Sequence, residues 1–190
     1  LSREIEAIRF AILAGRWEEA LARTGTLRSR AGLGLHLRHP WRVVVAGRPN
    51  VGKSSLVNAI LGYRRAIVHE TPGTTRDVVG AQTALDGYPV MLYDTAGIRD
   101  AAGRIEKSGI SKARRRMADS DLILLLHDSS TQWTESDEVL RRSLPAAIAV
   151  YNKTDLPSSI PIPEGAYPLS ALSGAGLPSL IEAIVSRLVP

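Results

Sequence analysis

The 190-residue sequence contains no cysteine, a single phenylalanine and no long run of apolar residues. Without cysteine the chain can form neither disulfide bonds nor thiolate metal sites, which fits a reducing cytosol. Apolar stretches such as VVVAG and LILLL are far shorter than the ~20 residues that a membrane-spanning helix needs, and the N-terminus has no signal-peptide pattern. We therefore expect a cytoplasmic globular protein without a membrane segment. The chain starts at Leu1 rather than methionine, which fits a piece of a longer protein.

Aromatic residues are also missing from the basic segments of the chain. The formal net charge is +5 and the sequence pI is near 9.9, which favours anionic partners. Seven arginines lie in the first 39 positions, and a second cluster comprises Lys112 and Arg114–Arg116. Because no aromatic side chains interleave with these arginines as base-stacking platforms, solvated helix faces are the favoured interpretation. An RNA or protein partner for the basic helix and the N-terminal arm stays open as the alternative.

The hydrophobic pattern divides the chain into a helical arm, residues 1–39, and a second domain, residues 40–190. Ser2–Ala22 shows helical spacing interrupted at Gly15, and the Gly- and Arg-rich residues 24–40 fit either a linker or a further helix. Beyond Pro40, short apolar runs alternate with helical segments, so we expect an α/β fold with a mostly parallel sheet covered on both faces. The expected strands are 42–47, 78–85, 90–93, 122–126, 146–151 and 167–169, and the expected helices are 54–62, 105–117, 135–144 and 177–188.

The segment GRPNVGKSS, Gly47–Ser55, lies between a β-branched run and a helical segment. Two glycines that bracket four residues and precede Lys-Ser form the pattern of a phosphate-binding loop. In such a loop the backbone N–H groups and the start of the following helix surround a polyphosphate. We expect Lys53 to reach the terminal phosphates and to act in catalysis, and Ser54 to offer its hydroxyl to Mg²⁺. The residues expected to bind phosphate in this loop are Asn50, Val51, Gly52, Lys53, Ser54 and Ser55.

Two further segments supply expected partners for the phosphates and the metal. VMLYDTAG ends a strand with Asp94, which is expected to hold Mg²⁺ through water, and Gly97 offers an N–H group to the γ-phosphate. The polar segment TPGTTRD lies between the loop and this strand, and its Thr74 and Thr75 are candidates to cap Mg²⁺ and the γ-phosphate. Taken alone, this polar segment also fits an ordinary surface loop.

The segments YNKTD and SALSG predict which base is bound. Asp155 offers a carboxylate that can accept hydrogen bonds from both N1–H and the 2-amino group of guanine, a donor pair that adenine lacks. A polar site left unpaired by the wrong ligand can discriminate by roughly 10⁴-fold, so Asp155 favours GTP over ATP. We expect Asn152 to help hold the base and Lys153 to lay its stem along the ring. Ser170 and Ala171 complete the expected guanine site, with the Ala171 N–H group at guanine O6.

In this order GRPNVGKS, GTTRD, DTAG, NKTD and SALS resemble the motifs of the translation-factor-related GTPases, over about residues 42–188. The resemblance implies a P-loop NTPase with a three-layer α/β/α sandwich, here with an N-terminal helical extension, that hydrolyses GTP to GDP and phosphate with Mg²⁺. The run DTAGIRDAAGRIEKSGISKAR is most similar to tRNA-modification GTPases of the MnmE (TrmE) type. The ribosome-assembly GTPases of the EngA and Era type are the nearest alternatives.

The resemblance to the MnmE type also implies a way to accelerate hydrolysis. Ile98 stands where Ras-like proteins carry a water-orienting glutamine, and Glu106 matches the glutamate that replaces it. The family binds K⁺ in place of an arginine finger, through a phosphate-loop asparagine, here Asn50, and a loop that matches His69 to Thr71. We expect slow hydrolysis by the chain alone, and acceleration when K⁺ is present and two G domains meet across their switch regions. The plainer interpretations are a loop-stiffening hydrogen bond for Asn50 and an exposed helix residue for Glu106.

The sequence lacks the folate-binding domain and the C-terminal cysteine motif of the MnmE type, so tRNA modification does not follow from these residues alone. The alternative is a binding module, switched between GTP and GDP forms, that acts in ribosome assembly or RNA binding and hydrolyses GTP incidentally. An ATP-dependent enzyme is disfavoured because Asp155 selects guanine.

Overall fold

The computed structural model describes residues 2–63, 80–95 and 117–189. The described residues up to His39 form one compact unit, and Pro40–Leu188 contain another. In the described ranges, every helix is too short or too polar to cross a lipid bilayer. The expected helix 105–117 lies almost entirely outside the described residues.

The N-terminal unit is a pair of helices, α1 (Ser2–Leu13) and α2 (Trp17–Arg38). Gly15 ends α1 with a φ of +69°, a left-handed conformation in which glycine carries no steric cost. The two helices pack on each other with Ala11 and Ala20 buried, and the Arg23 guanidinium lies 3.2 Å from the Glu4 carboxylate.

Of the two alternatives for residues 24–38, the structure shows the helix, because α2 continues to Arg38. Three glycines weaken this stretch, each by about 1 kcal/mol relative to alanine, but no proline blocks the helix before Pro40. The hydroxyl groups of Thr24 and Thr26 donate to the carbonyls one turn earlier, at 2.7 and 3.1 Å. Several large apolar side chains of this unit stay exposed, namely Phe10, Leu13, Trp17 and Leu21.

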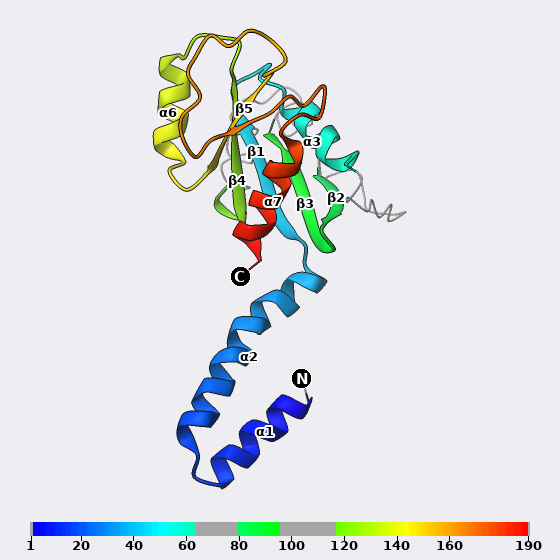
Figure 1. Ribbon diagram of the computed structural model, residues 1–190, viewed down its shortest axis with the longest axis vertical. Coiled ribbons are helices and arrows are strands. Elements are labelled where there is room, and N and C mark those ends of the chain that lie inside the picture. Colours follow the sequence, from blue (N-terminus) through cyan, green and yellow to red (C-terminus); the bar gives the residue numbers. More distant parts are fainter. Residues whose placement is uncertain (1, 64–79, 96–116, 190) are drawn as a thin grey trace, which may run out of the picture. The chain divides into compact units, whose positions relative to one another are not determined.

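The second unit contains a six-stranded sheet of order β2-β3-β1-β4-β5-β6 (Figure 1). All neighbouring strands are parallel except β2 and β3, which form an antiparallel hairpin over Asp86 and Gly87. The mostly parallel sheet expected from the sequence is therefore confirmed. The strands are β1 (Trp41–Gly47), β2 (Gly80–Leu85), β3 (Tyr88–Asp94), β4 (Leu122–Asp128), β5 (Ile148–Asn152) and β6 (Tyr167–Pro168).

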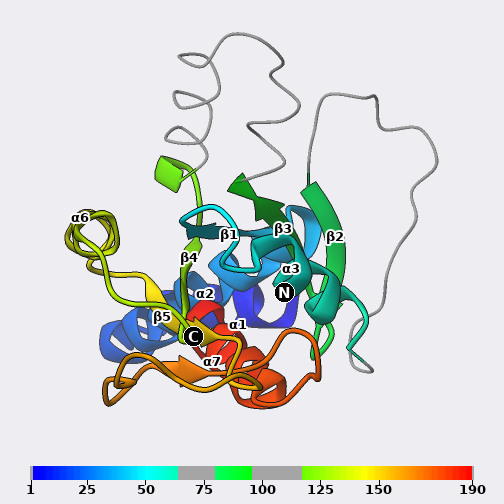
Figure 2. The same ribbon diagram turned by 90° about the horizontal axis from the view of Figure 1, so that it is seen from above.

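Described helices lie on both sides of this sheet (Figure 2). The helices α3 (Lys53–Leu61) and α7 (Leu177–Leu188) contact each other and cover one face with buried leucine and isoleucine side chains. The helix α6 (Glu135–Ser143) lies on the other side of β4 and β5. It begins with a capping box, in which the Thr134 side chain and the Asp137 side chain each bond the other's backbone N–H group.

The parallel register brings the carboxyl ends of four strands to one edge of the sheet. Gly47 of β1 pairs with Leu126 of β4, and Asp128 pairs with Asn152 of β5. β3 ends next to β1, with Asp94 paired to Val45. Ligands of open α/β sheets bind at this edge, so the fold gathers the motif-bearing loops where a nucleotide would sit.

Candidate nucleotide-binding site

The loop between β1 and α3 has an unusual backbone. Asn50 and Gly52 have φ values of 64° and 97°, both in the left-handed region. Such residues among right-handed neighbours turn successive N–H groups to one side, which forms an anion-binding concavity. Gly47, with a φ of 151°, lies so close to β4 that a Cβ atom would come within 2.5 Å of the Leu126 carbonyl oxygen. The two glycines of the sequence pattern are therefore required by backbone conformation and by close approach.

Lys53 closes this loop from the first turn of α3. Its side chain is buried, and Nζ donates a hydrogen bond of 2.7 Å to the Arg48 carbonyl oxygen. Gly52, the residue before α3, has no side chain with which to cap the helix start. Uncapped N–H groups at a helix start are the donors that bind phosphate in this type of loop.

Two oxygen-bearing side chains meet beside the loop. The Ser54 hydroxyl on α3 donates a hydrogen bond to the Asp94 carboxylate at the end of β3. Mg²⁺ prefers oxygen ligands and takes only one or two from the protein, the others coming from water and substrate phosphates. Ser54 and Asp94 therefore fit a magnesium site. Ser55, next along α3, is exposed.

Asn152 joins the phosphate loop to the segment that carries Ala171. Its side chain is 2% exposed, Nδ2 donates to the Val51 carbonyl oxygen at 2.9 Å, and Oδ1 accepts from the Ala171 N–H group at 2.9 Å. Each end of the amide group therefore has a hydrogen-bond partner within the protein. In this structure the Ala171 N–H group points to Asn152, so its predicted contact with guanine O6 stays a prediction.

Lys153 is the second link between the base motif and the phosphate loop. Its Nζ donates to the Asn50 carbonyl oxygen at 3.0 Å and to the Asp128 carboxylate at 2.6 Å. Burial opposes ionisation of Asp128, but hydrogen bonds from Lys153 and Ser130 outweigh it and lower the pKa of that carboxyl group. Asp128 was not predicted as a site residue from the sequence. The signal that could have identified it is a carboxylate at the end of a buried parallel strand.

Asp155 is exposed, beyond the end of β5. The Thr154 N–H group donates to the Leu169 carbonyl oxygen at 3.2 Å, which holds the segment of Asp155 beside the segment of Ser170. The Ser170 side chain is buried, and its Oγ accepts a hydrogen bond from the Ser173 N–H group. The fold thus brings the two halves of the predicted guanine site together.

Several predicted site residues lie outside the described ranges, and their roles stay predictions. They are His69, Thr71, Thr74, Thr75, Gly97 and Glu106.

Comparison with known proteins places this site in a family. The profile of the family described as 50S ribosome-binding GTPase matches residues 42–153. The chain is 45% identical over 152 residues to the tRNA modification GTPase MnmE of Synechococcus sp. (strain RCC307), covering 78% of this chain and 33% of that protein. It is 41% identical over 193 residues to MnmE of Chloroflexus aurantiacus, covering 97% of this chain and 43% of that protein. The chain thus spans less than half the length of these curated relatives.

Solved structures show the same fold. The G domain of the T. maritima FeoB iron transporter is 28% identical, with a TM-score of 0.54 over 77% of this chain and 98% of that chain. A variant of Aquifex aeolicus Era, bound to GDP.AlF4-, is 26% identical, with a TM-score of 0.56 over 78% of this chain and 56% of that chain. The resemblance to MnmE-type GTPases and the P-loop fold expected from the motifs are confirmed. Because the family profile matches more than half of the chain, this protein belongs to the 50S ribosome-binding GTPases.

Proposed function

We propose that residues 40–190 form a G domain that binds GTP with Mg²⁺ and hydrolyses it to GDP and phosphate, as part of a tRNA-modification GTPase of the MnmE type. The helical residues 1–39 are an arm that belongs to the remainder of that protein. One observation carries the proposal: Asn152 and Lys153 of the base motif both hydrogen-bond the backbone of the phosphate loop. The two ends of a nucleotide would therefore be recognised by one connected structure.

In the proposed complex the phosphates lie against the N–H groups of residues 50–55. Lys53, whose ammonium group bonds the Arg48 carbonyl oxygen, turns to the terminal phosphates. Ser54 and Asp94 hold Mg²⁺, which neutralises charge on the phosphate oxygens when it is bound. Their hydrogen bond to each other keeps both oxygens at the metal position before a nucleotide arrives.

At the other end, Asp155 accepts the two guanine donors, and the Lys153 stem lies along the base. The Lys153 ammonium group is fixed between Asp128 and the Asn50 carbonyl oxygen, which limits the rotamers of the stem. A stem ordered before binding loses less entropy when the base stacks on it. Ser170 and Ala171 form the opposite wall of the base site.

We further propose that hydrolysis is accelerated by K⁺ and by the meeting of two G domains across their switch regions. Asn50, His69 and Thr71 are the proposed K⁺ ligands, and Glu106 is proposed to orient the attacking water. Support comes from the similarity to MnmE and from the left-handed backbone of Asn50, with a φ of 64°, within the phosphate loop. A positive charge at this place would stabilise the charge that develops on the transferred phosphoryl group.

The test is GTP turnover in KCl and in NaCl of equal ionic strength, over a series of protein concentrations. We expect a faster rate per protein molecule in KCl, rising with concentration, and a rate at least tenfold lower for Glu106→Gln, as a lost catalytic base or water ligand costs about 10²-fold or more. Equal rates in both salts would remove the cation from the mechanism, and a rate per protein molecule that does not rise with concentration would remove the dimer. No GTP turnover in either salt would contradict the GTPase proposal itself.

A second candidate is a binding module, switched between GTP and GDP forms, that attaches to ribosomal particles or RNA. Two observations favour it: the family description, and the exposed apolar side chains of the arm, among them Phe10 and Trp17. Co-sedimentation with ribosomal subunits distinguishes the two candidates. Binding that depends on a non-hydrolysable GTP analogue supports the module, and equal recovery with GDP and with the analogue removes the switch.

A further inference from the structure

In the part of the chain that the structure describes, residues 48–51 of the phosphate loop make three polar contacts with side chains from other elements of the domain. Asn152 holds the Val51 carbonyl oxygen, and Lys153 holds the Asn50 carbonyl oxygen. The third contact is an ion pair between Arg48, the residue after Gly47, and Asp137 on α6. Arg48 Nε lies 2.8 Å from Asp137 Oδ1, without the alignment of a hydrogen bond. The first two belong to the base motif, whereas nothing in the nucleotide motifs accounts for the third.

Asp137 is held in a fixed position by α6. Its side chain is only 4% exposed, and Oδ2 accepts hydrogen bonds from the Thr134 N–H group at 3.0 Å and the Thr134 hydroxyl at 2.7 Å. The other oxygen, Oδ1, faces Arg48. The Asp137 carboxylate therefore both caps α6 and pairs with the phosphate loop. A shift of the start of α6 would change the position of the carboxylate relative to Arg48.

The His127 ring, itself packed against two other aromatic rings, lies beside Asp137. The His127 ring lies 4.6 Å from the Trp133 ring and 5.2 Å from the Tyr151 ring, centroid to centroid. His127 Nδ1 is 3.6 Å from Asp137 Oδ1 and has no hydrogen-bond partner among the described residues. The Asp137 side chain is therefore shielded from water, while that of Arg48 is 27% exposed, so this ion pair is less screened than pairs in which both side chains face solvent.

We propose that Arg48 and Asp137 are positioning residues of the phosphate loop, which anchor it to α6 and thereby set its affinity for nucleotide phosphates. The Arg48 side chain is paired with Asp137, and the Arg48 carbonyl oxygen accepts a hydrogen bond from the Lys53 ammonium group. Fixing residue 48 therefore fixes the start of the loop and the place from which Lys53 reaches the phosphates. This inference rests on the proposed nucleotide binding, because it concerns the same site.

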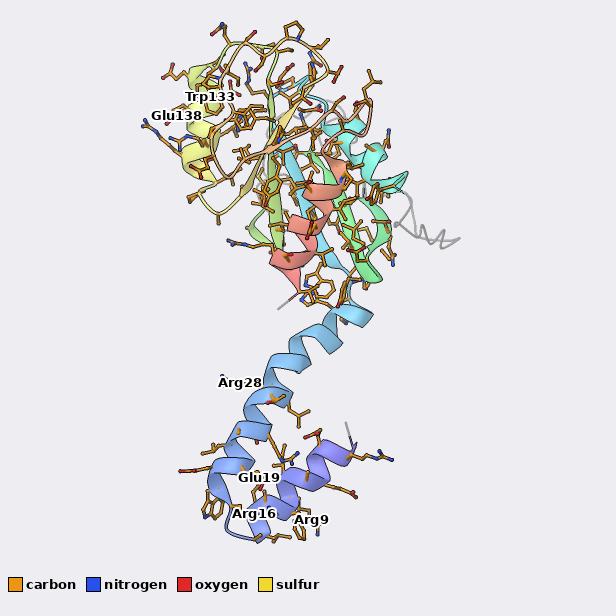
Figure 3. The ribbon with its side chains drawn as sticks, viewed as in Figure 1. Arg9, Arg16, Glu19, Arg28, Trp133 and Glu138 are labelled. Atoms are coloured by element: carbon orange, nitrogen blue, oxygen red, sulfur yellow. The ribbon has the colours of Figure 1, made fainter. Side chains whose placement is uncertain are left out.

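The same helix offers a matched control. Glu138 pairs with Arg142 at 2.7 Å, but this pair lies on the exposed side of α6 and touches no residue of the loop (Figure 3). Glu138→Gln removes an acid from α6 as Asp137→Asn does, without a link to the phosphates. Asp137→Asn keeps a carbonyl oxygen that can accept from Thr134, so the cap is preserved in part.

The experiment measures the dissociation constant for GDP by calorimetry, with Mg²⁺ present, and the kcat and KM for GTP. The proteins are the wild type, Arg48→Ala, Asp137→Asn, the double variant and Glu138→Gln. We expect each single substitution to raise the Kd for GDP about fivefold to twentyfold and the KM in proportion, with kcat changed less than about twofold. The Kd of the double variant for GDP is expected to be at most about twice the higher of the two single-variant values. The Kd of Glu138→Gln is expected to stay within about twofold of wild type.

Three results would overturn the proposal: an Arg48→Ala variant that binds GDP within twofold of wild type, single effects that multiply in the double variant, or a loss in kcat with KM unchanged. If the pair had only a structural role, the substitutions would lower the melting temperature of the apo protein. Their effects on the Kd for GDP would then be independent and would multiply in the double variant. If the wild type itself binds no GDP, the proposed function fails, and that outcome is distinct from the three above.

Discussion

Replacement of Asn152 by alanine tests the bridge between the base motif and the phosphate loop. The side chain is 2% exposed and makes two hydrogen bonds, to the Val51 carbonyl oxygen and from the Ala171 N–H group, both 2.9 Å. A buried hydrogen bond contributes about 1 kcal/mol net, and a group left without its partner costs about 1–3 kcal/mol. Because alanine leaves both backbone groups without this partner, we expect a loss of about 2–4 kcal/mol in the free energy of unfolding.

The assay is thermal unfolding followed by circular dichroism, without nucleotide, because a bound ligand would add stability by mass action. For a domain of this size 1 kcal/mol corresponds to about 2–4 °C, so the melting temperature should fall by about 5–15 °C. Asn58→Ala is the matched control: Asn58 is exposed on α3, and its replacement should change the melting temperature by less than about 2 °C. A drop for Asn152→Ala no larger than that of the control would refute the reasoning.

The remaining predictions concern the metal site, the Lys153 ammonium group with its partner Asp128, and the buried His127. Ser54→Ala removes the hydroxyl that bonds Asp94, so GTP turnover should fall at least about tenfold and need more Mg²⁺ for half-maximal rate; a Mg²⁺ titration identical to wild type would contradict the assignment. Asp128→Asn removes the charge that fixes the Lys153 ammonium group, so the affinity for GDP measured by calorimetry should fall about threefold to tenfold. An unchanged affinity would show that the pair of Asp128 and Lys153 is not needed for nucleotide binding. Burial lowers the pKa of His127, so the folded protein keeps this ring neutral while the unfolded chain takes up a proton near pH 6.5. The unfolded state then binds more protons, so stability should fall as pH falls from 7 to 5, and urea unfolding of His127→Phe should lose part of that slope. A slope equal to that of the wild type would exclude His127 as its source.

The elements around the phosphate loop could be predicted because their signals are local. A β-branched run, two glycines at fixed spacing and an apolar helical face determine β1, the loop and α3 without distant information. Boundaries were less accurate: β4 continues to Asp128, two residues beyond the predicted end, and β3 begins at Tyr88, two residues before the predicted start. At such positions backbone pairing with neighbouring strands extends an element past its apolar residues.

The long-range contacts of the site could not be predicted in the same way. Asp128 and Asp137 lie in segments with no nucleotide motif, and only the parallel register and the capping box of α6 bring them to Lys153 and Arg48. The Gly- and Arg-rich residues 24–38 lacked a clear helical pattern, yet they are helical because no proline interrupts α2. Propensity is a weak guide where packing and side-chain bonds to the backbone decide the outcome.

The most direct test of the central claim is an isothermal titration of GDP, and in parallel of ADP, into the protein with Mg²⁺ present. We expect saturable heat with one GDP bound per chain and no detectable heat with ADP. Equal binding of both nucleotides would contradict guanine selection by Asp155, and absence of heat with GDP from folded protein would contradict the nucleotide site as a whole.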